Sequence, residues 1–293
     1  NFNNCTYQLP YIFPNKNFKN KIIVVPGGGS KVRFSTLITD TIPDLGLLSA
    51  CQCFPIKLYQ KIEKGTLFDF DNDSKNNISI DGLNKKIFYK FKNFYEKKNT
   101  TSEELFYYIY GLLHSTDYID RFENNLKKDL PRIPFVKKYT DYISFSDAGR
   151  KLADIHINYE KAKPYKLKVT KENVQFKNEK DKRSFYNVKK AKIAGIRSNL
   201  NKKTIIYNNN IKLEEIPIEA YNYIVNGKSA IDWVIERQSI TTDKDSNITN
   251  DANDYANETM KNPAYPLELL QRVITVSLET MKIVKSLPKL EIK

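Results

Sequence analysis

The stretch YIYGLLHSTDYIDRFENNLKKDLPRIPF (residues 108–135) combines two helical patterns with a proline-bounded end. Its first part is apolar at helical spacing and contains His114. Apolar residues then recur at every fourth position, namely Tyr118, Phe122 and Leu126. Pro131 stops a helix, and Pro134 keeps the residues around it extended, because proline cannot continue a helix and restricts the residue before it. The stretch therefore predicts two helices followed by an extended segment.

Helix-start signals surround this stretch. Thr101-Ser102-Glu103-Glu104 has the spacing of a capping box, in which the first and fourth residues bond each other's backbone amides. Ser115 or Thr116 can cap the second helix. We expect a third helix from Ser146 to about Ile157.

The segments on either side predict short strands. Residues 21–40 predict a buried strand, a glycine turn and a second strand or short helix, and residues 45–59 predict a core strand. The polar loop at 69–84 predicts a soft boundary. Residues 161–216 predict mostly strands, with a hairpin around an asparagine turn at 204–216.

Helices are expected again near the C-terminus. Ser229 is placed to cap a helix, with Asp232 at the box position. Residues 243–254 predict a loop. Pro266, in a first helical turn, opens a long helix that ends before Pro288.

The composition fits one large domain or two moderate ones. The chain has 293 residues, of which 40% are hydrophobic, enough for a packed core. We expect an α+β fold of mixed short strands and helices, with a helical middle segment and a helical C-terminal segment. An N-terminal lobe would cover 1–160, with strands and then helices from about 101. Residues 161–293 would combine a basic strand-rich segment with C-terminal helices.

The termini and cysteines indicate where the chain works. No apolar run approaches the roughly 18 residues that span a bilayer, and no signal peptide opens the chain. Because the chain begins at Asn1 and not at Met, we expect a piece of a longer polypeptide. Cys5, Cys51 and Cys53 suit a reducing cytosol, so we expect a cytoplasmic protein without membrane partners. Cys51-x-Cys53 lacks the second pair or histidine of a zinc site.

The positive charge is concentrated in one segment. The whole chain has a net charge of +14, and residues 161–203 contain fifteen Lys and Arg against three Asp and Glu. Aromatic residues are interleaved with them. This pattern favours a polyanionic partner, most often nucleic acid, and a solvated lysine-rich surface is the alternative.

Three motifs of nucleotide chemistry are incomplete. Gly227-Lys228-Ser229 resembles the end of a phosphate-binding loop, but Asn222 occupies the position of its first glycine, which favours a helix cap after a turn. The glycines at 27–29 lack the dinucleotide-binding spacing and predict a hairpin turn. Residues 262–265, Asn-Pro-Ala-Tyr, differ by one residue from the Asn-Pro-Pro-Tyr signature of adenine methyltransferases. They precede a long helix, so a helix entry is favoured.

Metal chemistry is represented only by weak patterns. Asp44, Asp73 and Lys75 follow the order of a metal-dependent nuclease site, but the latter two lie in a polar loop and not on a strand. Residues 243–254 begin like a calcium-binding loop, with isoleucine where that loop requires glycine.

The two histidines, His114 and His156, lie among apolar residues on expected helices. This placement favours buried structural histidines over catalytic ones. We expect no catalytic residue, no metal site and no cofactor in this chain.

The opening stretch also resembles a segment of large single-chain bacterial restriction-modification proteins that follows their adenine-methyltransferase part. There a Tyr-Gly-x-Leu-His-Ser helix, a Tyr…Arg-Phe/Tyr helix and Leu-Pro-Arg-Ile-Pro occur in this order. Residues 34–59, 147–160, 216–254 and 269–288 are similar to segments of the Type ISP restriction enzymes in particular. From about residue 20 onwards, only the lysine-rich residues 161–203 have no match, as expected of a segment that varies with the DNA sequence.

The resemblance implies a C-terminal target-recognition region. The full-length proteins join a nuclease, an ATP-driven translocase, an adenine-N6 methyltransferase and this region, so they would use S-adenosylmethionine, ATP and Mg²⁺. The upstream methyltransferase and translocase domains would be partners within one polypeptide, with double-stranded DNA as the external partner. No catalytic residue of the family can be assigned to a position in this chain.

Under this hypothesis, lysines contact phosphates and planar side chains read bases. Arg183 and Arg197 are candidates for guanine, and Asn199, Asn201 and the turn at 208–210 for adenine. The expected phosphate contacts are Lys182, Lys189, Lys190, Lys192, Lys202 and Lys203. Arg132, Arg150 and Lys151 are further backbone candidates, with surface or packing roles as the alternative.

Two other functions remain open. The chain could be a structural coupling region with non-specific DNA contact, or a nuclease that uses Asp44, Asp73 and Lys75. RNA binding is disfavoured, because no signature of a known RNA-binding module is present.

Overall fold

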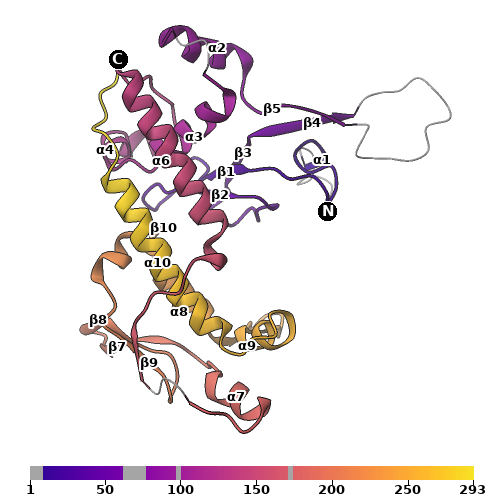
Figure 1. The fold of residues 1–293 in the computed structure, drawn as a ribbon, viewed down its shortest axis with the longest axis vertical. Coiled ribbons are helices and arrows are strands. Elements are labelled where there is room, and N and C mark those ends of the chain that lie inside the picture. Colours follow the sequence, from indigo (N-terminus) through magenta and orange to yellow (C-terminus); the bar gives the residue numbers. More distant parts are fainter. Residues whose placement is uncertain (1–8, 62–76, 97–99, 171–173) are drawn as a thin grey trace, which may run out of the picture. The chain divides into compact units, whose positions relative to one another are not determined.

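The computed structural model describes residues 9–61, 77–96, 100–170 and 174–293 (Figure 1). It is an α+β fold, as the sequence predicted. The chain divides into two units, with unit 1 comprising Asn1–Ile157 and Ile283–Lys293, and unit 2 comprising Asn158–Lys282. The C-terminal residues from 283 onwards thus belong with the N-terminal half, whereas the sequence-based lobes ran 1–160 and 161–293. Among the described residues, no helix is both long and apolar enough to cross a bilayer.

Unit 1 combines small antiparallel sheets with a helical core. A three-stranded sheet has the order β2-β1-β3, and β4 pairs with β5. The strands are β1 (Ile22–Val25), β2 (Leu37–Thr39), β3 (Gln52–Pro55), β4 (Lys57–Lys61) and β5 (Asn77–Asp81). The helices are α1 (Leu9–Ile12), α2 (Lys85–Phe94), α3 (Ser102–Leu112), α4 (Thr116–Arg121), α5 (Glu123–Leu126) and α6 (Tyr139–Ile157).

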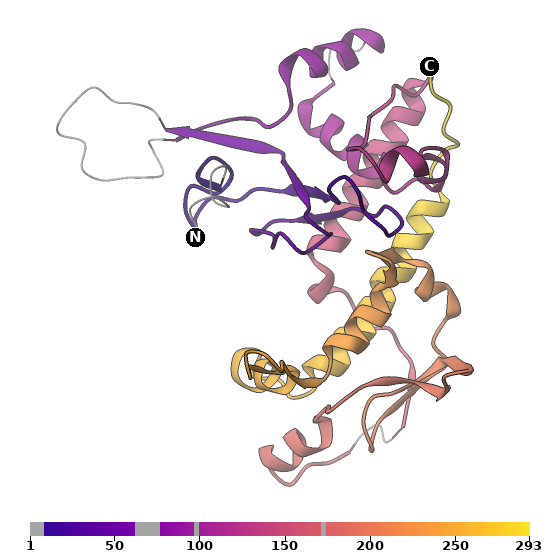
Figure 2. The same ribbon diagram turned by 180° about the vertical axis from the view of Figure 1, so that it is seen from behind.

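Unit 2 is built around a four-stranded antiparallel sheet of order β6-β9-β8-β7, with two separate hairpins (Figure 2). Its strands are β6 (Lys168–Val169), β7 (Lys192–Ile196), β8 (Asn199–Ile206), β9 (Lys212–Glu214), β10 (Ile224–Val225), β11 (Lys228–Ser229), β12 (Ile240–Thr242) and β13 (Thr249–Asp251). Its helices are η1 (Tyr159–Lys161), α7 (Glu179–Tyr186), η2 (Ile218–Asn222), α8 (Ala230–Arg237), α9 (Ala252–Asp254), the π-helical η3 (Tyr255–Thr259) and α10 (Tyr265–Lys285), whose last residues belong to unit 1. Ile205 and Leu213 of the sheet and Leu270 and Ile274 of α10 are buried in one apolar cluster.

The local signals in the sequence are mostly confirmed. Thr101 forms the capping box with Glu104, and Ser115 caps α4. Ser229 accepts a hydrogen bond from the Asp232 amide at the start of α8. The asparagine turn joins β8 to β9, and α10 ends before Pro288.

Five expectations about elements are corrected. The third helix begins at Tyr139, well before Ser146. The basic segment contains the helix α7, which a strand pattern did not predict; Asn178 caps it by accepting from the Asp181 amide at 2.9 Å. The expected loop at 243–254 contains β13 and α9. The core strand expected at 45–59 is instead β3 and the start of β4, and β3 is only half-buried. Half of the loop expected at 69–84 lies outside the described residues, and the other half contains the strand β5.

An extended segment in unit 1 accepts hydrogen bonds from three buried tyrosines. The Tyr118 hydroxyl donates to the carbonyl oxygen of Arg132 at 2.8 Å, that of Tyr108 to Pro134 at 2.7 Å, and that of Tyr95 to Val136 at 2.8 Å. The acceptors are alternate residues, as expected for an extended chain. Burial raises the pKa of Tyr118 to about 12, so its hydroxyl keeps the proton that it donates. The residues after Pro131 are therefore held by side chains of the helical core.

Helices α3 and α6 cross through two glycines. A Cβ atom on Gly149 would lie 1.9 Å from the carbonyl oxygen of Tyr107, and one on Gly111 would lie 2.1 Å from that of Phe145. Such distances are far below van der Waals contact, so the two backbones can approach this closely only because both positions lack a side chain.

The first prediction concerns this crossing. Gly149→Ala should lower the free energy of unfolding by about 3 kcal/mol, because the helices must separate to admit the methyl group. Urea unfolding of the two proteins measures the difference. Lys151→Ala, an exposed change on the same helix, should shift it by less than about 0.5 kcal/mol. Equal effects of the two changes would contradict the steric account.

Both histidines lie together in the same core. Their ring centroids are 5.4 Å apart, and His156 Nδ1 lies 2.6 Å from the Tyr110 hydroxyl. His114 Nδ1 lies 2.9 Å from the Tyr110 carbonyl oxygen, so it carries the proton of the neutral ring, and its buried Nε2 has no hydrogen-bond partner among the described residues. Burial lowers the pKa of His114 to about 4, and burial together with His114 lowers the pKa of His156 well below its usual value. This arrangement supports the structural interpretation of both residues.

The second prediction is that the fold loses stability at pH values above those at which Asp and Glu carboxylates bind protons. In the unfolded chain both histidines bind protons near pH 6.5, whereas the folded chain keeps them neutral. Stability should therefore be constant above about pH 7 and fall as the pH drops through about 6.5 towards 4. Urea midpoints at about pH 7.5 and 5.5 would measure this. His114→Phe should reduce the pH dependence, and an unchanged slope would contradict the assignment.

Candidate nucleic-acid interface

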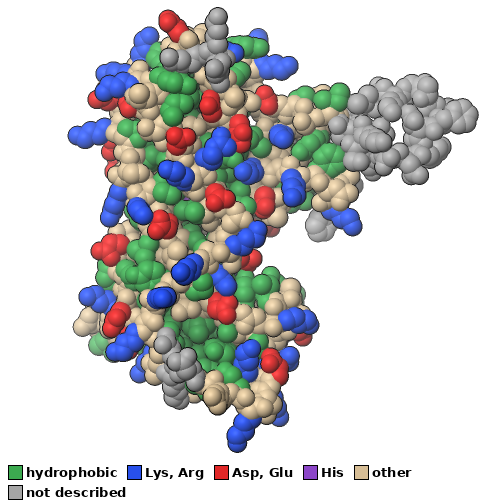
Figure 3. Space-filling view, viewed as in Figure 1, with side chains coloured by type: hydrophobic (Ala, Val, Ile, Leu, Met, Phe, Trp, Pro, Cys, Tyr) green, Lys and Arg blue, Asp and Glu red, His purple; other side chains and the backbone are tan. Residues whose placement is uncertain are grey.

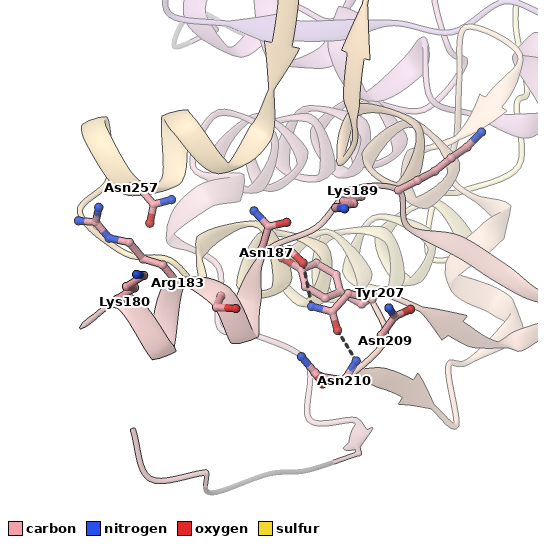
Figure 4. A pocket seen from close by; sticks show the side chains of 11 residues that line it. Lys180, Arg183, Asn187, Lys189, Tyr207, Asn209, Asn210 and Asn257 are labelled. Carbon is pink, nitrogen blue, oxygen red and sulfur yellow. Dashed lines mark hydrogen bonds between the residues drawn. The ribbon is translucent and has the colours of Figure 1, made fainter. Parts of the chain in front are cut away.

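A basic groove in unit 2 contains several of the predicted DNA-contacting residues (Figure 4). It has a volume of about 590 Å³ and lies between α7, the segment after α7, and the β8–β9 turn. Its lining consists of Lys180, Arg183, Ser184, Asn187, Lys189, Lys190, Tyr207, Asn208, Asn209, Asn210 and Asn257. Four of these side chains are cationic and none of the described lining residues is acidic, so the groove favours an anionic ligand.

One asparagine builds the floor of the groove. The Asn208 amide nitrogen donates to the carbonyl oxygens of Phe185 and Asn187, both at 2.9 Å. Its Oδ1 accepts from the backbone amides of Asn210 and Ile211, both at 2.8 Å. Asn208 therefore closes the β8–β9 turn and ties it to the end of α7.

Two further bonds hold the same segment. The Tyr207 hydroxyl donates to the Tyr186 carbonyl oxygen at 2.8 Å. Buried Asn253 accepts from the Val188 amide at 2.8 Å and donates to the Val188 carbonyl oxygen at 3.0 Å. Residues 185–188 are thus fixed by side chains from two other parts of unit 2, which keeps the groove preorganised.

Three further asparagines of the groove, Asn209, Asn210 and Asn257, differ from Asn208 in their bonding. No hydrogen bond joins the side chains of Asn209 and Asn210 to the described part of the chain, and Figure 4 shows both at the turn. Asn257 lies on the π-helical turn η3, a geometry often found at functional sites. Its Oδ1 is buried and has no partner among the described residues.

Arg183 is held only loosely. Its Nε atom is 3.8 Å from Glu179 Oε1, one turn earlier on α7, and both side chains are about half exposed. Such a surface pair contributes little to stability, so the guanidinium can move to a stronger acceptor. Lys182, on the same helix, is half-buried and does not line the groove.

Lys189 and Lys190 follow α7 and are exposed. The carbonyl oxygen of Lys189 accepts from the Ile240 amide at 2.9 Å, which fixes the backbone while leaving the side chain available. Lys190 also lines a second groove of about 670 Å³, beside β7 and α8, together with Lys192 and Lys228. Lys190 therefore lies where the two grooves meet.

The other candidates of unit 2 lie on the β7–β8 hairpin. Arg197 is in its turn, and Asn199 and Lys203 are exposed on β8. Lys202 Nζ lies 5.3 Å from the ring centre of Tyr221. Asn201 serves the strand itself, because it accepts from the Lys203 amide at 3.1 Å and donates to Thr204 Oγ1 at 3.3 Å.

The candidates of unit 1 are not brought together. Arg150 pairs with Glu103 at 3.0 Å and lies 4.3 Å from the ring centre of Tyr107, so it has a packing role. Arg132 is exposed in the extended segment after α5, and Lys151 is exposed on α6. On the face drawn in Figure 3, Lys and Arg side chains are interspersed with Asp and Glu.

The motifs of other chemistries take structural roles. Gly227 and Asn226, both with positive φ, form the turn between β10 and β11 that leads into α8. Gly27 and Gly28 sit against backbone carbonyl oxygens, where a Cβ atom would approach to 2.6 Å, so they allow close packing. Asn262 accepts from the Ala264 amide at 3.1 Å at the entry to α10.

The metal patterns find no support in the described part of the chain. Asp44 accepts from the Gly46 amide in a turn, while Asp73 and Lys75 lie outside the described residues. Asp243 bonds Ser246 and the Asp245 amide within the β12–β13 loop. Among the described residues, no three acidic, histidine or cysteine side chains cluster as a metal site.

Some groove residues were missed by the sequence analysis. Lys180 belongs to the basic segment and could have been named with Lys182, but the helical geometry that brings only one of them into the groove was not predicted. Asn187 and Asn257 carry no sequence signal, because asparagine is common in this chain and the π-helical turn has no recognised pattern.

Comparisons with known proteins identify the family. The chain matches the family model "Type ISP C-terminal specificity domain" over residues 1–269. It therefore belongs to the C-terminal specificity domains of Type ISP restriction-modification enzymes, as the sequence resemblance implied.

Solved structures of DNA complexes are similar. An "ATP-dependent Type ISP restriction-modification enzyme LlaBIII bound to DNA" is 35% identical, with a TM-score of 0.79 over 98% of this chain and 17% of that chain. A nuclease-deletion mutant of the Type ISP enzyme LlaGI, in complex with a DNA substrate mimic, is 34% identical, with a TM-score of 0.73 over 98% of this chain and 19% of that chain. A DrdV–DNA complex is 28% identical, with a TM-score of 0.76 over 96% and 26%. This chain thus spans between 17% and 26% of the length of these relatives. No curated protein sequence matches it.

The third prediction separates the asparagines of the turn. Asn208→Ala should lower the free energy of unfolding by about 2 kcal/mol, because it leaves four partly buried carbonyl and amide groups without partners. Asn209→Ala should change it by less than about 0.5 kcal/mol. Thermal unfolding of the two variants tests this, and similar losses would show that the turn does not depend on Asn208.

Proposed function

We propose that this chain recognises a specific sequence in double-stranded DNA as the specificity domain of a bacterial restriction-modification protein. The observation that carries the proposal is the groove of unit 2. It combines the cations Arg183, Lys189 and Lys190 with asparagine amides that make no bond within the described chain. Membership of the specificity-domain family and the similarity to DNA-bound relatives support it.

The two kinds of side chain have separate tasks. Lysines bind phosphates as point charges, which gives affinity and register without sequence information. The planar Arg183 guanidinium can bond guanine O6 and N7 together, and an asparagine amide can do the same with adenine N6 and N7. Because the Glu179–Arg183 pair is weak, little stabilising free energy is lost when Arg183 leaves it to contact a base.

The rest of the enzyme activity is assigned to other segments of a longer polypeptide. An adenine-N6 methyltransferase using S-adenosylmethionine and a nuclease and translocase using ATP and Mg²⁺ would precede this chain. The target adenine would be flipped into the methyltransferase pocket, while this chain holds the flanking DNA. This chain itself would bind none of these cofactors.

Unit 1 fits the coupling role that the sequence analysis left open. Its candidate Arg150 is occupied by Glu103 and Tyr107. Its loop after β2 exposes Ile42 and Leu45 by 58% and 61%. We therefore place DNA reading in unit 2 and contact with neighbouring domains in unit 1.

The direct test is selection from a randomised duplex pool at near-physiological salt. Sequencing of the retained DNA should give a defined asymmetric motif. Salt-sensitive retention without a motif would leave non-specific grip as the function of unit 2 and would overturn the proposal.

The fourth prediction distinguishes base from phosphate contacts. Arg183→Ala should lower the preference at one base pair of the selected motif by about 1–3 kcal/mol. Lys190→Ala should weaken all sequences alike and reduce the salt slope by about one. Competition binding over several salt concentrations measures both, with Lys244→Ala, in the exposed β12–β13 loop, as the control. Unchanged binding by both groove variants would exclude the groove as the contact surface.

A further inference from the structure

The β7–β8 hairpin extends beyond the rest of its sheet. β8 pairs with β9 only at Ile205 and Ile206, whereas its pairing with β7 continues to Asn199 opposite Ile196. The hairpin closes there through a two-residue turn, Arg197-Ser198. Its tip is therefore a two-stranded ribbon without a neighbouring strand on the β9 side.

The shape of this tip is specified by its sequence. Gly195 has a φ of +100°, and a Cβ atom there would lie 2.4 Å from the Asn199 carbonyl oxygen. The register also shifts between Ile193 and Ala194. A bulge and a glycine of positive φ increase the local twist of a ribbon and redirect its side chains. The tip is thus a formed feature and not an irregular loop.

One face of the tip carries an unusual pair of side chains. Ile196 is 70% exposed, more than any other large apolar residue in the described part of the chain. Its cross-strand partner is Asn199, and directly opposite residues share a face of a ribbon. The Asn199 side chain is exposed and makes no hydrogen bond within the described chain. An apolar group and an amide are thus presented side by side to solvent.

The charge around this pair indicates its partner. Residues 192–203 contain four cations and no acid: Lys192, Arg197, Lys202 and Lys203. An apolar partner protein would not need this charge, whereas the phosphates on both sides of a DNA groove would match it. The major groove is wide enough to admit a two-stranded ribbon.

We propose that the β7–β8 hairpin enters the major groove and that Ile196 and Asn199 together read an A·T pair. The Asn199 amide bonds adenine N6 and N7, and the Ile196 side chain contacts a thymine C5-methyl group of that pair or its neighbour. These are the chemical features by which the major groove distinguishes A·T from the other pairs. This inference rests on the proposed DNA-reading function and names two specificity-determining residues for it.

The test removes the methyl group from the DNA. Duplexes carrying the motif selected by the wild-type chain are made with deoxyuridine in place of each thymine in turn, and their affinities are measured for wild type and Ile196→Ala. At one position, deoxyuridine should weaken wild-type binding roughly three- to fivefold, the order that burial of one methyl group provides. The Ile196→Ala variant should bind the thymine duplex more weakly than wild type does. Deoxyuridine at that same position should not weaken its binding further.

A matched variant and a second base analogue complete the test. Ile248→Ala changes an isoleucine that is 61% exposed in the acidic β12–β13 hairpin, and it should behave as wild type at every position. 7-Deazaadenine in place of the adenine of the same or the adjoining pair should weaken binding by wild type. The affinity of the Asn199→Ala variant should not respond to this replacement. Ile196 is so exposed that its replacement should leave the unfolding midpoint unchanged.

The outcomes separate this inference from the proposed function. If the chain selects a motif but Ile196→Ala keeps every deoxyuridine response of the wild type, the hairpin assignment is wrong and DNA reading stands. If the wild-type chain selects no motif, the proposed function fails and this inference fails with it.

Discussion

The fold of unit 1 depends on hydrogen bonds from buried tyrosines to an extended, proline-containing segment. Proline lacks the amide that a strand ladder requires, so residues 131–134 cannot be held as an ordinary strand, and backbone pairing begins only where Val136 bridges Ile292. The hydroxyls of Tyr95, Tyr108 and Tyr118 instead bond every second carbonyl oxygen of this segment. Each such bond contributes about 1 kcal/mol to stability, but a buried hydroxyl without a partner would cost more. The segment is therefore held in the one register in which all three hydroxyls are bonded. Together with the glycine crossing of α3 and α6, these bonds give Tyr108 and Tyr118 of residues 108–135 a structural role.

In unit 2, asparagine side chains bond backbone groups, as tyrosine hydroxyls do in unit 1. Asn208 and Asn253 tie the segment after α7 to two other parts of the unit. Because these amides satisfy backbone groups, the lysines and Arg183 can point outwards without being needed for stability. The residues that hold this segment and the residues that line the groove are therefore different.

Sequence patterns predicted local structure well and spatial relations poorly. Caps such as Thr101 and Ser229 act through residues three positions away, so their bonds are visible in the sequence. Helix α7 was missed because its charged residues show no apolar period, and only a cap at Asn178 indicates it. The basic segment was identified from charge alone, but charge does not say that Lys180 and Arg183 face one groove while Lys182 does not. Asn257 enters that groove from about 70 residues further along the chain, a distance over which no local rule operates.

The three consecutive asparagines of the β8–β9 turn have a consequence for how such a domain changes its target. Asn208 uses its whole bonding capacity on the chain, while Asn209 and Asn210 leave their amides to the groove. Under the proposed function, structure and readout would then be encoded at adjacent but separate positions. Mutations at 209 and 210 would alter the favoured bases while the turn stays closed, so a new specificity would arise without a period in which the domain fails to fold.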